Sequence, residues 1–251
     1  MSLSHEGVGV SEILKASFED SDSASESSTF SGIFLVLTFY FAFFRHQKIW
    51  LALSAIFCIL TFKRLAIVAV LFALVVSFLA PSLMRVKVPH GAIVALKVCT
   101  LLCAVLWTWM LLPDQQNLFI QLIGDTPSHF SMGRSDVLGY LLSSGFESYG
   151  YGSANEVAKA VFAAPFEMDL TKIALELTPL VMVLFVWVFW DVAGDSLWGI
   201  VIIGYFMINM ITSDSLTSNF CLTLAYMTCG LVTQTYERGG KNVLEVSDNA
   251  F

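Results

Sequence analysis

The chain has 251 residues, of which 57% are hydrophobic and 13% are charged, and its mean hydropathy is +0.75. A typical soluble domain is about 25% charged, so this composition lacks the polar surface that a water-soluble protein needs. The formal net charge of −7 argues against a nucleic-acid partner, because phosphate binding requires clustered Lys and Arg. The sequence therefore predicts an all-α, polytopic integral membrane protein.

The first predicted region, residues 1–29, is an acidic and Ser-rich tail. It buries too little apolar area to offset chain entropy, so we expect it to be disordered. Its acidic start differs from the basic start of a signal peptide, so we expect targeting to rest with the first hydrophobic segment.

Seven apolar runs follow the tail and are expected to form helices. They cover residues 30–44, 49–62, 65–84, 91–112, 173–193, 196–213 and 217–235. Because a helix rises about 1.5 Å per residue and the hydrocarbon core is about 30 Å thick, the third, fourth and fifth runs are long enough to cross. The last two are near the lower limit, and the first two are either short spans or an incompletely crossing hairpin. The sequence thus predicts five to seven membrane helices, in an N-terminal group (30–112) and a C-terminal group of three (173–235).

Basic residues in the loops predict the orientation of these helices. They lie at Arg45 and Lys48, Lys63 and Arg64, Arg85 and Lys87, and Arg238 and Lys241. If all seven runs cross, a lumenal N-terminus places three of the four clusters in the cytosol. If one of the first two runs does not cross, the N-terminus is cytosolic instead, and everything after the second cluster is unchanged. In both cases the C-terminal tail, residues 236–251, is cytosolic.

Residues 113–172 are the one sizeable polar segment after the tail. Gln115–Ile123 and Asp136–Leu142 carry apolar residues at helical spacing, so they are predicted to be amphipathic helices on the membrane surface. Ser153-Ala-Asn-Glu156 fits a capping box, in which the Ser hydroxyl and the Glu carboxylate each accept from a backbone amide. The helix it starts is expected to run to about residue 164, where Pro165 prevents continuation.

Three ionisable residues lie inside the apolar runs, where charges are costly and are candidates for function. They are Lys97, Glu176 and Asp191. Their depths favour an intramembrane pair between Lys97 and Asp191, because Glu176 sits near the opposite interface. Three interpretations are open: Lys97 reaches the interface while both acids sit at interfaces, the pair is a structural ion pair, or it serves transport or a proton relay.

The loop Gly145–Gly152 is rich in Gly and Tyr. Ser148-Tyr-Gly150-Tyr151-Gly152 resembles the filter of potassium channels, in which backbone carbonyls replace the water shell of the ion. The preceding residues do not form the pore helix of that family, so we expect a flexible aromatic surface loop. Motifs for catalysis, cofactors or metals are not found, so the sequence predicts no enzyme.

The overall layout resembles the small multi-spanning virion membrane protein of negeviruses and kitaviruses. The resemblance rests on the short polar tail, the closely spaced helices punctuated by Arg45-His-Gln-Lys48 and Lys63-Arg64, and the single middle polar segment, over about residues 30–235. That family often has a basic, Arg/Ser-rich tail, whereas this tail is acidic, so no RNA-facing role is carried over. The resemblance implies a structural protein of a host endomembrane or a virion membrane, with no catalytic residue to transfer.

These features favour a non-enzymatic multi-pass membrane protein that organises or shapes a membrane, with a lipid bilayer and either copies of itself or other membrane proteins as partners. An ion channel or small transporter is the first alternative, motivated by Lys97, Asp191 and the Gly-Tyr-Gly loop. An accessory subunit of a larger membrane complex is the second.

Overall fold

The computed structural model describes residues 28–44, 47–61, 63–216 and 218–248, and over these residues it is helical with no strand. This confirms the predicted all-α class. Residues 1–27 of the predicted acidic tail and residues 249–251 lie outside the described residues. The helices belong to two compact units. The units are discontinuous in sequence, so α5 (His90–Met110) groups with the central segment and not with the helices that precede it.

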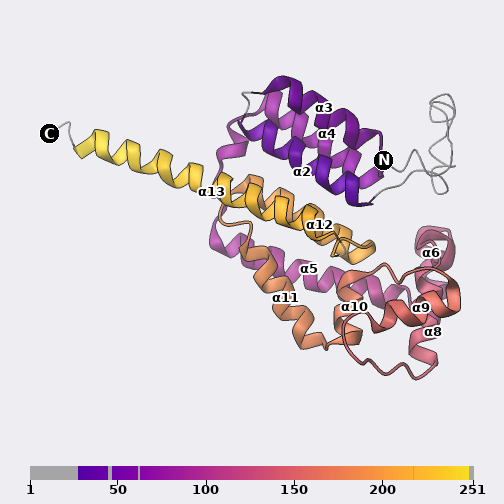
Figure 1. The fold of residues 1–251 in the computed structure, drawn as a ribbon. Helices are drawn as coiled ribbons and strands as arrows, with labels where there is room; N and C mark the ends of the chain where they lie inside the picture. Colours follow the sequence, from indigo (N-terminus) through magenta and orange to yellow (C-terminus); the bar gives the residue numbers. More distant parts are fainter. Residues whose placement is uncertain (1–27, 45–46, 62, 217, 249–251) are drawn as a thin grey trace, which may run out of the picture. The chain divides into compact units, whose positions relative to one another are not determined.

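Of the described residues, the first unit contains 28–44, 47–61, 63–88, 192–205 and 218–248. Its elements are α2 (Ser28–Phe44), α3 (Lys48–Ile59), α4 (Arg64–Leu79), the 3₁₀ turn η2 (Leu83–Arg85), the first part of α12 (Leu197–Thr212) and α13 (Asn219–Asp248). Helices α2, α3 and α4 pack side by side, and α13 packs against α2 (Figure 1).

Polar side chains form hydrogen bonds between the helices of the first unit. The Thr38 hydroxyl of α2 donates to the Ser54 hydroxyl of α3 at 3.1 Å. The indole N–H of Trp198, on α12, donates to the Phe39 carbonyl oxygen at 3.1 Å. Small residues that allow close approach, together with hydrogen bonds between helices, are typical of helix packing in membranes.

Helix α4 is the clearest case of an inverted side-chain distribution. Its buried residues are mostly small: Ala66, Val70, Ala73, Val76 and Ser77. Its exposed residues are mostly large: Val68, Leu71, Phe72, Val75, Phe78 and Leu79. The hydrophobic effect would place the larger side chains inside if water surrounded this helix.

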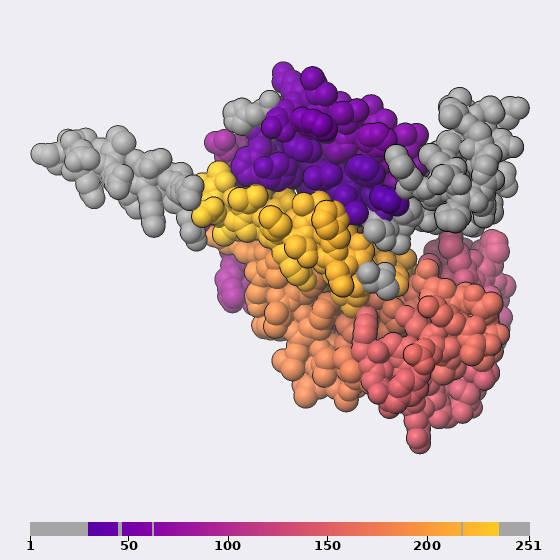
Figure 2. Space-filling model, viewed as in Figure 1, coloured from indigo at the N-terminus to yellow at the C-terminus, as the bar shows by residue number. Residues whose placement is uncertain are grey.

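The second unit contains residues 89–191 and 206–216. Its elements are α5, the 3₁₀ turn η3 (Pro113–Gln115), α6 (Gln116–Ile123), α7 (Pro127–Phe130), α8 (Arg134–Ser143), α9 (Ser153–Phe162), α10 (Asp169–Glu176), α11 (Pro179–Asp191) and the end of α12. The segment from α6 to α10 gathers into one body in the space-filling view (Figure 2).

This body has a hydrophobic core of its own, which the sequence analysis did not predict. The buried cluster consists of Leu111, Phe119, Val137, Leu138, Leu141, Ala154, Ala158, Phe166 and Met168. Of the two stretches predicted to be amphipathic, the one that forms α8 packs Val137, Leu138 and Leu141 into this core. Helix α6 still exposes Leu118, Ile120 and Leu122.

Two of the predicted long runs are shorter as helices, and proline is the reason. Helix α4 ends at Leu79 because Pro81 disfavours helical geometry at the residue before it. The run 173–193 is divided between α10 and α11, and α11, which begins at Pro179, has 13 residues. Among the described helices, only His90–Met110, with 21 residues, is long and apolar enough to cross a membrane. The shorter apolar helices are Phe30–Phe44, Lys48–Ile59, Arg64–Leu79, Pro179–Asp191 and Leu197–Thr212.

Candidate functional site

Buried charged side chains are concentrated in the second unit, where Lys97, Asp169, Lys172 and Glu176 are all buried. A buried charge is costly unless it is paired and hydrogen-bonded. The partners of these four residues therefore define the candidate site, which has one part between α5 and α11 and a second part around α10.

The structure brings Lys97 and Asp191 together. Lys97 Nζ on α5 lies 2.6 Å from Asp191 Oδ1 on α11, and it also lies 4.5 Å from the centre of the Trp187 ring. Only 2% of the Lys97 side chain is exposed, against 59% of the Asp191 side chain. Three residues further along α5, the Trp190 indole N–H donates to the Thr100 hydroxyl at 3.0 Å. The pair thus joins the two helices, and its lysine end is the buried one.

This asymmetry predicts different effects for the two partners. Asp191→Asn removes the negative charge and leaves the buried ammonium only an amide oxygen and the Trp187 ring beside it, so we expect a loss of about 2 kcal/mol in the free energy of unfolding. Lys97→Met keeps the side-chain length and leaves a carboxylate that is already largely exposed, so we expect a loss below about 1 kcal/mol. Thermal unfolding of the purified variants in detergent measures both. A larger loss for Lys97→Met would contradict the asymmetry.

The Glu176 carboxylate caps the start of α9. Its two carboxylate oxygens accept from the backbone N–H groups of Gly152 and Ala154, each at 2.7 Å. The Ser148 hydroxyl donates to the Glu176 carbonyl oxygen at 2.7 Å. A negative charge at a helix N-terminus is stabilised by the unpaired amides and the helix dipole. Glu176 therefore fastens the Gly/Tyr loop to α10.

The predicted capping box is not formed, although the helix it was expected to start is present. The N-cap of α9 is Gly152, with φ of 104°, and Ser153 is already the first helical residue. The Ser153 hydroxyl donates to the Gly150 carbonyl oxygen at 2.8 Å. That carbonyl is therefore used within the turn, and the loop closes the start of α9.

Removing the Glu176 carboxylate is expected to loosen this loop. In Glu176→Ala the amides of Gly152 and Ala154 lose their acceptor, so we expect their hydrogen exchange to become at least tenfold faster, since hydrogen bonds to charged groups contribute about 1.5–3 kcal/mol. Glu147→Ala is the matched control, because Glu147 is an exposed carboxylate within the same loop. Exchange measured by mass spectrometry over 145–156 tests this. Equal exchange in wild type and Glu176→Ala would contradict the capping role.

The third group joins α10 to the turn between α12 and α13. Asp169 Oδ2 accepts from the backbone N–H groups of Ser215, at 2.6 Å, and Leu216, at 2.9 Å. Lys172 Nζ lies 3.0 Å from Asp169 Oδ1 and 3.8 Å from Asp214 Oδ2. We call Asp169, Lys172 and Asp214 the α10 cluster. It has two acids for one base, and it holds the turn 213–216 against α10.

Burial raises the pKa of Asp169 to about 6, and the Lys172 charge opposes this rise. The negative charge of Asp214 raises the pKa of Asp169 further, whereas the two backbone N–H groups lower it. Burial, followed by the charges of Asp169, Asp214 and Glu176, raises the pKa of Tyr151. Tyr151, in the Gly/Tyr loop, therefore lies within the electrostatic field of the α10 cluster.

The sequence analysis missed the α10 cluster, although one signal was available. Asp169, Lys172 and Glu176 are spaced at i, i+3 and i+7, which places three charges on one face of a helix that has only eight residues. All three are buried, so the charged face points inward. The predicted boundary at residue 172 divides this face, since it assigns Asp169 and Lys172 to the polar segment and Glu176 to the apolar run that follows.

The arrangement binds segments of the second unit together. Each of the buried charges described above meets an opposite charge or a backbone N–H group. Among the described residues, no three His, Cys, Asp or Glu side chains gather as a metal site requires. Comparison of the chain with protein-family models, curated proteins and solved structures found no match.

Proposed function

We propose that the chain is a non-enzymatic, multi-pass membrane protein that organises or shapes the bilayer through its inserted helices. The proposal assigns α2 to α5 and α11 to α13 to the membrane, and it assigns the body from α6 to α10 to one side of it. The observation that carries the proposal is the exposure of large apolar side chains on the helices that bury small or polar ones.

Helix α5 repeats the distribution described for α4. It buries Ile93, Lys97, Thr100 and Ala104. It exposes Val98, Leu102, Val105, Leu106 and Trp109. Only 22% of the most apolar stretch of α5 is buried inside the structure, whereas the core helix of a soluble protein is mostly buried. Soluble monomers rarely expose a continuous apolar surface beyond a few hundred Å², and a lipid environment accounts for such a face without cost.

The short helices support a role in shaping the bilayer. Helix α3 has 12 residues and α11 has 13, which correspond to about 18–20 Å of helix against a hydrocarbon core of about 30 Å. Apolar helices shorter than the core are accommodated by local thinning of the bilayer, by oligomerisation or by insertion into one leaflet. Each of these responses alters the membrane or brings copies of the protein together.

Reconstitution of the full chain into liposomes tests the proposal in two steps. Flotation with the liposomes, and resistance to extraction by alkaline carbonate, are the results expected of inserted helices. Electron microscopy of the same liposomes is expected to show tubules or smaller vesicles at increasing protein density. A chain that stays at the bottom of the gradient would contradict membrane insertion, and a chain that floats but neither deforms liposomes nor self-associates would contradict the shaping role.

A channel or small transporter is the second candidate, and the buried Lys97 beside Asp191 is the observation that favours it. Ionisable residues inside membrane segments often mark ion or substrate pathways. Ion flux across proteoliposomes that is lost in Lys97→Leu would favour this candidate. Absence of flux in the wild type would count against it.

A further inference from the structure

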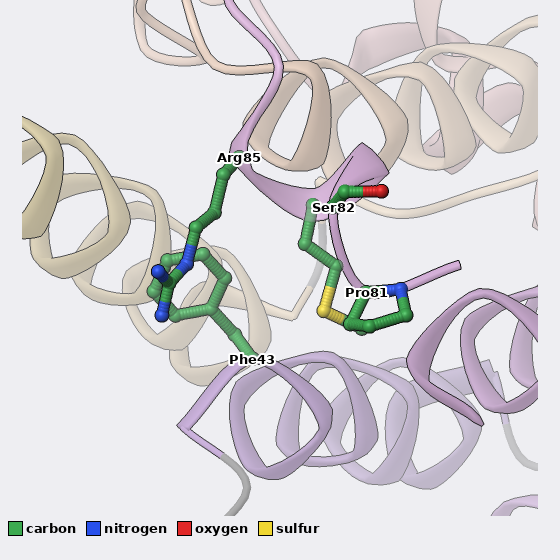
Figure 3. A pocket seen from close by; sticks show the side chains of 5 residues that line it. Phe43, Pro81, Ser82 and Arg85 are labelled. Carbon is green, nitrogen blue, oxygen red and sulfur yellow. The ribbon is translucent and has the colours of Figure 1, made fainter. Parts of the chain in front are cut away.

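We propose that a cavity beside Arg85, in the first unit, binds the anionic headgroup of a single phospholipid. The cavity has a volume of about 390 Å³ and is lined by Phe43, Pro81, Ser82, Met84 and Arg85 (Figure 3). The inference rests on the membrane insertion of α2 and α4 proposed above. It adds a ligand and a binding site to that proposal.

The position of the cavity suits a lipid headgroup. Phe43 is the penultimate residue of α2, and Pro81 and Ser82 follow directly after the end of α4. The cavity therefore lies where two apolar helices end together. In a membrane protein this is the level at which the hydrocarbon gives way to the headgroups.

Arg85 supplies the charge that a phosphate group needs. Its guanidinium presents several N–H donors in a planar fork that matches phosphate oxygens. Arg85 is exposed and has no acidic partner within 4.0 Å among the residues that the structure describes. The neighbouring cation, Lys87, is already paired with Asp195 at 3.0 Å. Arg85 is thus the cation of this connecting segment that is available to a ligand.

The remaining lining distinguishes a lipid from a free phosphate ion. Phe43, Pro81 and Met84 give the cavity an apolar wall. A phosphate ion would leave the apolar wall unused, whereas the glycerol and upper acyl carbons of a phospholipid would cover it. The volume is near the lower end of the range for ligand pockets, about 300–1,000 Å³, which suits a headgroup with its glycerol.

The exposed end of α4 offers a path for the acyl chains. Phe78 and Leu79, in the last turn of α4, are 68% and 80% exposed. Both precede the cavity residues Pro81 and Ser82 by only a few positions. A lipid with its phosphate at Arg85 can therefore lay its chains along this apolar surface.

Native mass spectrometry of the full chain in detergent tests the site, with dioctanoyl phosphatidylglycerol as the probe. Dioctanoyl phosphatidylcholine and glycerol 3-phosphate are the comparison ligands. We expect one phosphatidylglycerol to be retained more tightly than either. Arg85→Gln is expected to weaken phosphatidylglycerol binding about fivefold, the effect of one basic residue facing an anionic lipid. Ser82→Trp keeps the arginine but fills the cavity, and is expected to weaken binding at least as much.

Lys159→Gln is the matched control, because it removes an exposed positive charge from α9, outside the first unit. Unchanged phosphatidylglycerol binding in Arg85→Gln, or an equal loss in Lys159→Gln, would overturn the site. Glycerol 3-phosphate bound as tightly as the lipid would overturn the lipid as its ligand. Liposome flotation separates this inference from the function it rests on: a chain that floats but shows no preference for phosphatidylglycerol contradicts the lipid site alone.

Discussion

Replacing Lys172 with methionine is expected to lower the free energy of unfolding by about 3–5 kcal/mol, the usual cost of breaking a buried ion pair from one side. The Lys172 side chain is 1% exposed and the Asp169 side chain 0%. Methionine fills a similar volume but removes the cation that lies beside the buried Asp169 carboxylate. The cost therefore comes from an uncompensated charge and not from a cavity.

A second substitution separates charge from packing. Adding Asp169→Asn to Lys172→Met removes the stranded charge, while the amide oxygen can still accept from the Ser215 and Leu216 N–H groups. We expect the double variant to be more stable than Lys172→Met alone. Thermal unfolding midpoints of both variants, in the same detergent, give the comparison. A double variant less stable than the single one would contradict the account of the α10 cluster.

The effect of Lys172→Met is also expected to depend on pH. In the wild type the pKa of Asp169 is raised from 3.8 to about 6. Between these two pH values, the folded state therefore binds a proton that the unfolded state does not. The resulting stability is fully present below the ordinary pKa and is lost as the pH rises through the folded pKa. Without Lys172 the pKa of Asp169 rises further, so the deficit should be larger at pH 8 than at pH 5. Equal deficits at the two values would count against a charge effect.

Replacing Gly199 with alanine is expected to destabilise the first unit by about 3 kcal/mol, at the upper end of typical overpacking costs. A Cβ atom at Gly199 would lie 2.3 Å from the Ala193 carbonyl oxygen and 3.2 Å from its carbonyl carbon. Both are backbone atoms, so no side-chain rotation relieves the contact. The start of α12 would have to move away from the preceding turn, and the bond from the Gly199 N–H to the Ser196 hydroxyl, at 2.9 Å, would be disturbed.

Gly230→Ala is the control for this substitution. Gly230 also lies in a helix, but nothing lies within 4 Å of a Cβ built there. Alanine is favoured over glycine in helices by up to about 1 kcal/mol, so Gly230→Ala is expected to be neutral or stabilising. Unfolding midpoints of the two variants measure the difference. A Gly199→Ala variant as stable as Gly230→Ala would show that the close approach to Ala193 does not exist.

Local features of the fold could be predicted from the sequence because they depend on neighbouring residues. Hydrophobic periodicity predicts the helices, and proline geometry predicts that α9 ends before Pro165. The positions of Lys97 and Asp191 along their helices predict that the two side chains meet. The break of the run 173–193 was also readable, because Pro179 removes a helical hydrogen bond. Because the sequence is apolar on both sides of Pro179, the run was predicted as one continuous helix.

Features that depend on distant residues could not be predicted in this way. Glu176 accepts from amides that lie 22 and 24 positions away, and Asp169 from amides 46 and 47 positions away. No local sequence pattern identifies these distant backbone N–H groups as partners of Glu176 or Asp169. The apolar face of α8 has the same spacing whether it packs into a core or onto a membrane surface. Only the fold decides between the two.

The most direct test of the proposed function asks whether the exposed face of α4 meets lipid or water. Spin labels at Leu71 and Phe78, which are exposed, are compared with labels at buried Val70 and at Tyr149 in the Gly/Tyr loop, in a variant with all five cysteines replaced. After reconstitution, we predict high collision rates with oxygen and low rates with a water-soluble nickel chelate at Leu71 and Phe78. We predict low rates with both at Val70, and high rates with the chelate at Tyr149. High rates with the chelate at Leu71 and Phe78 would place this face in water and contradict the proposal.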